Sequence, residues 1–114
     1  MFSLASTTRV YVALEPIDLR QGFNGLHGLV QNRLGADPCN GQLYLFTNRR
    51  RNRLKVLYWD GSGLWLCTKR LEQGTFGWPQ GEESGGASTT LSAEEFRLLV
   101  SGLELHSRPH WYRK

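Results

Sequence analysis

Three strand-like segments joined by two short loops constrain the fold of this chain more than any other feature. The segments QLYLFTN, RLKVLYW and GLWLCTKR lie within residues 42–70, and NRRRN and DGSG separate them. Both connecting sequences have the length and the turn-forming residues of tight loops between antiparallel strands. We therefore expect three consecutive antiparallel strands near residues 42–48, 53–59 and 64–70.

The two loops also predict the register of these strands. With residues 49–52 as the first loop and residues 61–62 at the centre of the second, Leu43 lies opposite Tyr58 and Arg53 lies opposite Arg70. Side chains alternate between the two faces of a strand, so each face can be assigned from the sequence. One face, the expected core side, carries Leu43, Leu45, Leu54, Val56, Tyr58, Trp65 and Cys67. The other face carries Tyr44, Phe46, Arg53, Lys55, Leu57, Trp59, Leu64, Leu66 and Arg70.

Two amphipathic segments predict helices. Asp18 and Gln21 have the spacing of a capping box, and the apolar pattern that follows ends at Gly35, which suits a left-handed helix end. Ser92 and Glu95 form a second capping-box pattern before another apolar stripe. The first helix would place Phe23, Leu26, Val30 and Leu34 near one face, and Phe96, Leu99, Val100 and Leu103 would form the apolar stripe of the second.

The chain has the size of one domain, because 114 residues can bury a core without disulfides or metal ions. We expect an α+β domain at residues 9–105, with an antiparallel sheet of about four to five strands and two helices packed on one face. Residues 9–14 would supply a further strand. We expect flexible residues 1–8, a mobile loop at 80–88, and a basic aromatic tail at 106–114.

Composition predicts a cytoplasmic protein that needs no cofactor, and the nucleic-acid binding considered below would associate it with the nucleoid. The chain is 39% hydrophobic and 21% charged, as globular proteins are, and lacks an apolar run long enough to span a membrane. Its N-terminal residues lack the basic start of a secretory signal. Cys39 and Cys67 form no CxxC pattern and are too few for a disulfide framework.

The positive charge is concentrated in one segment. The net charge is +4, yet residues 49–70 hold seven of the fourteen Lys and Arg residues and one acidic residue, Asp60. Arginines on a tight loop can reach phosphate groups, and neighbouring aromatic side chains such as Tyr44, Phe46 and Trp59 can stack on bases. An acidic protein partner, or a solvated loop that binds nothing, remains an alternative. The candidate nucleic-acid-binding residues are Arg49, Arg50, Arg51, Arg53, Lys55, Lys69 and Arg70.

We expect no enzymatic activity and no metal site. Metal-dependent strand transfer needs carboxylates that converge on divalent ions, and the ten carboxylates here fall in turns, caps and loops. No serine or cysteine lies in a nucleophile motif. His106 and His110 have a helical metal-ligand spacing, but Pro109 disfavours a helix between them. No residue is therefore assigned a catalytic role.

In combination, these segments resemble one known family closely, over roughly residues 10–103. The chain resembles the TnpB-type accessory proteins, the second open reading frame products, of the insertion-sequence-66 family of bacterial transposable elements. The motifs that carry the resemblance run from Asp18-Leu-Arg20 and Gly41-x-Leu43-Tyr-x-Phe46 through Asn48-Arg-Arg-Arg51, Arg53-Leu-Lys55 and Leu57-Tyr-Trp-Asp-Gly61 to Gly63-x-Trp65-Leu66, Lys69-Arg-Leu-Glu72, Gly74-x-Phe76 and Trp78-Pro79.

The resemblance implies a protein encoded beside a separate, larger transposase that assists the movement of the element. It carries over no catalytic residue. Together with the basic hairpin it predicts binding to transposon-end or target DNA, or to a complex of DNA and transposase. The alternative is an adaptor without DNA affinity, because apolar surface patches commonly mark partner sites. That patch, Leu57, Trp59, Leu64 and Leu66, would then dock on the transposase or on a second copy of the chain.

Overall fold

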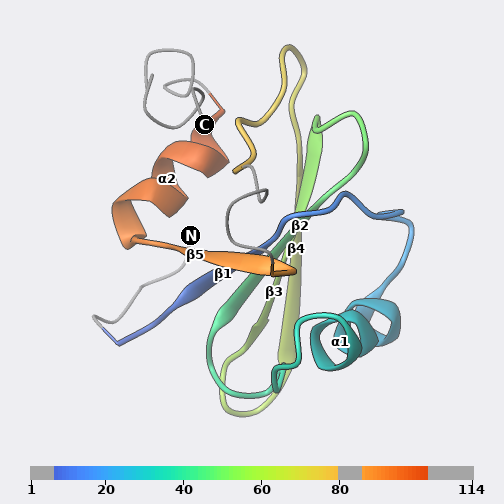
Figure 1. The fold of residues 1–114 in the computed structure, drawn as a ribbon, viewed down its shortest axis with the longest axis vertical. Helices are drawn as coiled ribbons and strands as arrows, with labels where there is room; N and C mark the ends of the chain where they lie inside the picture. Colours follow the sequence, from blue (N-terminus) through green and yellow to red (C-terminus); the bar gives the residue numbers. More distant parts are fainter. Residues whose placement is uncertain (1–6, 80–85, 103–114) are drawn as a thin grey trace.

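A computed structural model describes residues 7–79 and 86–102 of the chain, and Figure 1 shows their arrangement. These residues form an α+β fold, as the sequence predicts. The elements in chain order are β1 (Val10–Ala13), α1 (Phe23–Asn32), β2 (Leu43–Thr47), β3 (Arg53–Trp59), β4 (Leu64–Arg70), β5 (Ser88–Leu91) and α2 (Ala93–Ser101).

The strands form one five-stranded sheet in the order β4-β3-β2-β1-β5. The registers predicted for β2, β3 and β4 are confirmed, with Leu43 opposite Tyr58 and Arg53 opposite Arg70. The expectation of a purely antiparallel sheet is wrong, because β1 runs parallel to β2, with Val10 opposite Leu43. The connection through α1 returns the chain to the end of the sheet where β1 began, and such crossovers join parallel strands.

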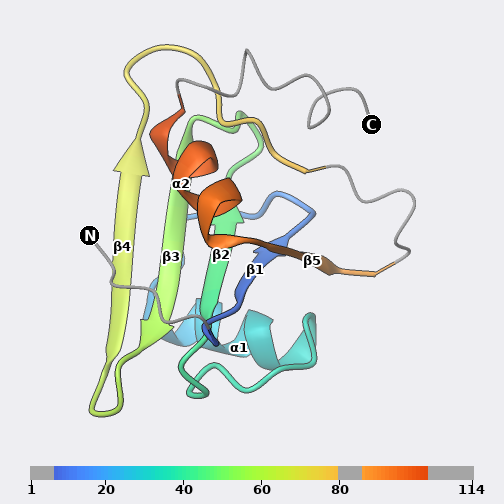
Figure 2. The ribbon, with the colours of Figure 1, turned by 90° about the vertical axis from the view of Figure 1, so that its left-hand side faces the viewer.

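The two helices lie on opposite faces of the sheet, as the edge-on view of Figure 1 and the face-on view of Figure 2 show. The expectation that both pack on one face is therefore wrong. The reason lies in β2, whose five residues are all buried, so that both of its faces are apolar and each needs cover. The crossover helix α1 covers one face, and α2, which follows the edge strand β5, covers the other.

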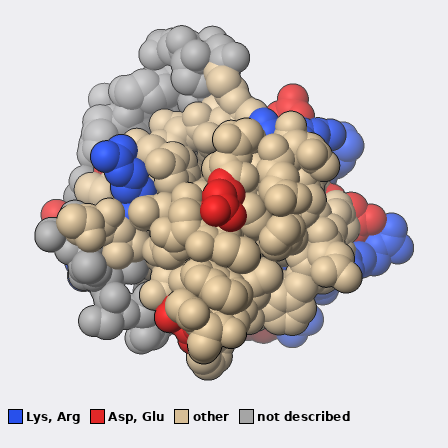
Figure 3. All heavy atoms as spheres, turned by 90° about the horizontal axis from the view of Figure 1, so that it is seen from below, with Lys and Arg blue, Asp and Glu red and all other residues tan. Residues whose placement is uncertain are grey.

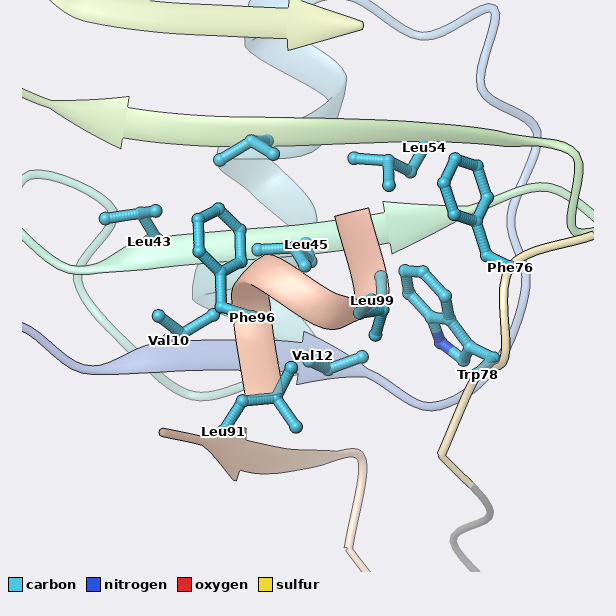
Figure 4. Close-up of a cluster of buried hydrophobic side chains, with 11 residues drawn as sticks. Val10, Val12, Leu43, Leu45, Leu54, Phe76, Trp78, Leu91, Phe96 and Leu99 are labelled. Carbon is cyan, nitrogen blue, oxygen red and sulfur yellow. The ribbon is translucent and has the colours of Figure 1, made fainter. Parts of the chain in front are cut away.

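Each helix encloses its own hydrophobic cluster. The α2-side cluster, drawn in Figure 4, consists of Val10, Val12, Leu43, Leu45, Leu54, Val56, Phe76, Trp78, Leu91, Phe96 and Leu99. The α1-side cluster consists of Ala13, Leu19, Leu26, Val30, Tyr44, Phe46 and Leu57. Trp65, expected in the core, is instead 55% exposed, because it lies on the edge strand β4 at the end that α2 does not reach (Figure 2).

The helix starts match the sequence prediction for one helix only. At α2 both hydrogen bonds of the predicted capping box are present, between Ser92 and Glu95. At α1 the predicted box is wrong, since Gly22 is the N-cap and no side chain caps it. Asp18 binds Arg20 instead.

The predicted left-handed conformation at Gly35 is confirmed by its φ of +64°, although α1 itself ends at Asn32. Residues 1–6 of the predicted tail, residues 80–85 of the predicted loop and residues 103–114, including His106, His110 and Leu103, lie outside the described residues. Ser88, the last residue of the loop predicted at 80–88, instead begins strand β5. None of the helices in the described part of the chain has the length and apolar character needed to cross a membrane.

Candidate nucleic-acid interface

The β2–β3 loop is held in shape by an asparagine at its start. The side-chain oxygen of Asn48 accepts hydrogen bonds of 3.2 Å from the backbone N–H groups of Asn52 and Arg53. Its amide nitrogen donates to the side-chain oxygen of Asn52 at 2.8 Å. Arg51 has a φ of +60° and donates its N–H to the Asn48 carbonyl. These bonds fix the turn and leave Arg49 and Arg50 exposed at its tip.

Residues 16–21, the segment before α1, are held beside this loop by two hydrogen bonds. The N–H of Ile17 donates to the carbonyl oxygen of Thr47 at 2.9 Å. The ammonium of Lys55 donates to the carbonyl oxygen of Gln21, also at 2.9 Å. The acceptor Thr47 belongs to β2 and the donor Lys55 to β3, so residues 16–21 lie against the basic hairpin although they precede it by some thirty positions.

A cleft of about 670 Å³ lies between residues 16–21 and the β2–β3 hairpin. Five cationic side chains line it, and Asp18 is the one carboxylate among its lining residues. An excess of positive charge in a concave site focuses the electrostatic potential and attracts anions. The sequence prediction missed Arg20 as a site residue, and its position in the family motif Asp18-Leu-Arg20 was the available signal. The lining cations are Arg20, Arg49, Arg50, Arg53 and Lys55.

Asp18 and Arg20 form an ion pair at the edge of the cleft. Nη2 of Arg20 lies 2.7 Å from Oδ2 of Asp18, and Nε donates to the same carboxylate. Hydrogen bonds from the Arg20 side chain and backbone lower the pKa of Asp18 to about 2. The pair is solvent-exposed, with 91% of the Arg20 side chain accessible, so its attraction is screened by water. Arg20 is therefore oriented by Asp18 and still accessible to an anion.

The structure divides the predicted basic patch. Arg49, Arg50, Arg53 and Lys55 come together at the cleft. Lys69 lies on the opposite face of the sheet, where its ammonium donates to the carbonyl oxygen of Val100 at 2.8 Å. The prediction that it extends one continuous patch is wrong for this residue, because side chains alternate along β4.

Two further arginines of the predicted patch lie outside the lining of the cleft. Arg70 shares a sheet face with Arg53, its partner in the strand register, but it pairs with Glu72 at 3.2 Å. Arg51 is partly buried in the loop, and its carbonyl oxygen accepts a hydrogen bond from the N–H of Phe76. In the view of Figure 3 most Lys and Arg side chains lie along the right-hand margin and one group lies at the upper left, and the surface between them carries little charge.

The aromatic side chains expected to stack on bases are not available. Tyr44 and Phe46 are buried beneath α1, at 0% and 1% exposure, and belong to the α1-side cluster. The ring of Tyr44 stacks on that of Tyr11 with centroids 5.4 Å apart, and burial raises the pKa of its hydroxyl. Trp59 is half-buried. The aromatic part of the prediction is therefore wrong for Tyr44 and Phe46, and the cleft presents charge without a stacking surface.

The predicted apolar patch is also smaller than the sequence indicates. Leu57 is fully buried in the α1-side cluster and cannot contact a partner. Leu64 and Leu66 are half-buried and pack against the same cluster. The described residues contain no group of three His, Cys, Asp or Glu side chains placed to hold a metal ion.

Comparison with known proteins identifies relatives along nearly the whole chain. A family model described as IS66 Orf2-like protein matches residues 8–110. The chain is similar to the uncharacterized protein y4jC of Sinorhizobium fredii (strain NBRC 101917 / NGR234), with 46% identity across 84% of this chain and 80% of that protein. The uncharacterized protein y4hO of the same strain is 36% identical across 97% of this chain and 95% of its own length. No solved structure matches the chain significantly.

Proposed function

This chain belongs to the IS66 Orf2-like family, and we propose that it serves DNA transposition as an accessory protein that binds DNA through its basic cleft. Family membership suggests the accessory role in transposition. The binding of DNA is the finer step, and it rests on the charge and shape of the cleft between residues 16–21 and the β2–β3 loop.

The observation that carries the proposal is the convergence of cations from two distant parts of the chain. Arg20 comes from the segment before α1, whereas Arg49, Arg50 and Arg53 come from the hairpin. Their guanidinium groups suit phosphate oxygens, because each presents several N–H donors in a fixed planar arrangement. Lys55 contributes charge and is already bonded to Gln21. A cleft of this composition supports binding to a polyanion such as the DNA backbone.

The same geometry supports recognition of phosphates rather than bases. Phosphate contacts position a protein on DNA, but sequence is read by contacts to the base edges or by base stacking. Tyr44 and Phe46 are buried, so the described cleft has no aromatic platform for bases. We therefore expect binding that depends steeply on salt and only weakly on sequence. Each neutralised phosphate contributes a slope of about −0.9 in log K against log salt.

The transposase of the same element is the proposed protein partner, since the family works beside it. An adaptor that docks on the transposase without touching DNA remains the second candidate function. Its specific support is the pair of half-buried leucines, Leu64 and Leu66, beside Trp59. Apolar side chains that stay partly accessible on adjacent strands are typical of partner sites.

Fluorescence anisotropy tests the DNA-binding proposal directly. The full chain is titrated onto a labelled duplex of the terminal repeat of the element and onto a scrambled duplex, from about 50 to 200 mM salt. The variant Arg49→Ala/Arg50→Ala/Arg53→Ala removes three cleft cations. Lys69→Ala is the matched control, because it removes a cation on the next strand but on the opposite face.

Salt-dependent binding that the triple variant loses and the Lys69→Ala control keeps would support the cleft. An equal loss of affinity per removed charge in the two variants would mean that net charge, rather than this site, attracts the DNA. Absence of binding at every salt concentration would reject direct DNA contact. Co-elution of the chain with its transposase in size-exclusion chromatography would then favour the adaptor.

A further inference from the structure

Strand β4 forms one edge of the sheet over its full length. It pairs with β3 on one side only, from Leu64 to Arg70, and the described residues place no strand beyond it. Figure 2 shows β4 at the margin of the sheet, with α2 over the middle strands. A seven-residue edge strand offers a row of backbone hydrogen-bonding groups to another strand, and proteins commonly shield such edges.

The hydrogen-bond pattern identifies which backbone groups of β4 face away from β3, towards the open edge of the sheet. The N–H of Asp60 donates to Gly63 and the N–H of Leu71 donates to Asn52, so both ends of the β3–β4 hairpin are hydrogen-bonded pairs. Such pairs alternate with non-bonded pairs along an antiparallel ladder. The odd-numbered residues 65, 67 and 69 therefore bond to β3. The backbone groups that face outward are those of Leu64, Leu66, Thr68 and Arg70.

We propose that a second copy of this chain pairs antiparallel with β4 and forms a two-fold symmetric dimer centred on Cys67. This register pairs all seven residues of each strand. In this register the outward-facing backbone groups of Leu66 bond to those of Thr68 in the other copy. The two Cys67 residues lie opposite each other. It also covers Trp65, which is 55% exposed in the single chain.

Charge distribution along β4 favours a second copy in this orientation. The cations Lys69 and Arg70 lie at one end of the strand, and the apolar Leu64 and Trp65 lie at the other. Antiparallel pairing about Cys67 sets Lys69 opposite Trp65 and Arg70 opposite Leu64. Like charges are thus kept apart, whereas directly opposed like charges destabilise a strand pair. The charged end of β4 in each copy therefore lies beside the apolar end of β4 in the other copy.

The dimer would place two basic clefts on the same side of one continuous sheet. The two-fold axis of an antiparallel strand pair is perpendicular to the sheet, so side chains keep their face in both copies. Each copy then presents its α1 side and its cleft in the same direction. This consequence rests on the proposed function, because it would give one dimer two contacts with DNA. The pairing of β4 itself does not depend on DNA binding.

Sedimentation velocity of the full chain, from low to high micromolar concentration and without DNA, tests the dimer. We expect a concentration-dependent shift from monomer to dimer. Thr68→Pro removes an outward N–H without removing a bond to β3, and proline is tolerated at such edge positions. It should remain monomeric and folded by circular dichroism, whereas the matched Thr68→Ala control should dimerise. A wild-type chain that stays monomeric throughout would overturn the proposal.

Cross-linking tests the register in a variant whose β4 strand is unchanged. Opposed residues at a non-hydrogen-bonded position have Cα atoms about 4.5 Å apart, which lies within the range for a disulfide. Mild oxidation with diamide should cross-link the Cys39→Ser variant through Cys67, and should leave the Cys67→Ser variant uncross-linked. A dimer that forms without a Cys67 cross-link and survives Thr68→Pro would use another surface and would overturn the assignment to β4.

Discussion

The ammonium of Lys55 on β3 donates a hydrogen bond of 2.9 Å to the backbone carbonyl oxygen of Gln21. This bond joins the central hairpin to the segment that leads into α1. Gln21 directly follows Arg20, so the bond from Lys55 holds Arg20 at the wall of the cleft. The geometry of the proposed DNA site depends on this link between two regions that are distant in sequence.

Replacing Lys55 with methionine should lower both stability and DNA affinity. A hydrogen bond from a charged donor contributes about 1.5–3 kcal/mol when well formed, and we expect a loss of about 1 kcal/mol at this half-buried position. Urea denaturation measures the change. Lys69→Met is the control, because the ammonium of Lys69 donates a hydrogen bond of 2.8 Å to the backbone carbonyl oxygen of Val100, at an exposed position on the other face. It should affect stability but leave DNA affinity unchanged, and an equal loss of affinity would contradict the cleft.

Changes to the Asp18–Arg20 pair should shift DNA affinity in opposite directions. Arg20→Ala should weaken binding at all sequences and reduce the salt slope by about 1, as expected when one phosphate contact is lost. Asp18→Asn should strengthen binding, because it removes the carboxylate of the cleft and releases the Arg20 guanidinium. Anisotropy over a salt series measures both. An unchanged slope in Arg20→Ala would place the DNA away from this wall of the cleft.

Asp60 should contribute to the acid sensitivity of the fold. Its pKa is lowered from 3.8 to about 2 by hydrogen bonds from the Ser62 backbone, the Trp65 indole and the Gly63 backbone. Because the folded pKa lies below the ordinary value, the stabilisation is fully present above about pH 4 and is lost as the pH falls towards 2. Asp60→Asn should therefore be less stable at neutral pH and show a flatter acid decline. Urea unfolding from pH 2 to 7 measures the free energy of unfolding of the wild-type chain and of Asp60→Asn. A parallel decline of both values with falling pH would contradict this role of Asp60.

Trp78→Phe should destabilise the α2-side cluster. The indole nitrogen of Trp78 donates to the carbonyl oxygen of Ala13 at 2.8 Å, and the side chain is 4% exposed. Phenylalanine would leave that carbonyl without its donor and would leave a small void. We expect a loss of about 2 kcal/mol in urea denaturation. Trp65→Phe, at an exposed position, should cost clearly less, and equal losses would argue against the importance of the buried bond.

Ser92→Ala should destabilise α2 by about 1 kcal/mol, because the serine side chain accepts the N–H of Glu95 at the helix start. Glu95→Gln keeps the second half of the capping box, since a glutamine oxygen can still accept from the Ser92 N–H. It should change the free energy of unfolding much less. Thermal unfolding followed by circular dichroism compares the two, and similar midpoints for both variants would contradict a role for the serine hydroxyl.

The sequence by itself determined the local structure. The alternation of apolar residues and the turn sequences fixed the registers of β2, β3 and β4, and the spacing of Ser92 and Glu95 fixed the start of α2. These features depend on residues close together in the chain. The sequence also located the hairpin arginines, because seven cations lie within residues 49–70. Three of those arginines, Arg49, Arg50 and Arg53, do lie at the cleft.

Only the tertiary structure decided which strand faces are covered. Alternation assigns Tyr44, Phe46 and Leu57 to one face, but it cannot tell whether a helix packs on that face. The packing of α1 buries all three and removes them from any binding surface. In the same way, the bond between Lys55 and Gln21 brings Arg20 to the hairpin across more than thirty positions. Contacts between distant residues depend on the packing of whole elements, and local patterns in the sequence do not encode that packing.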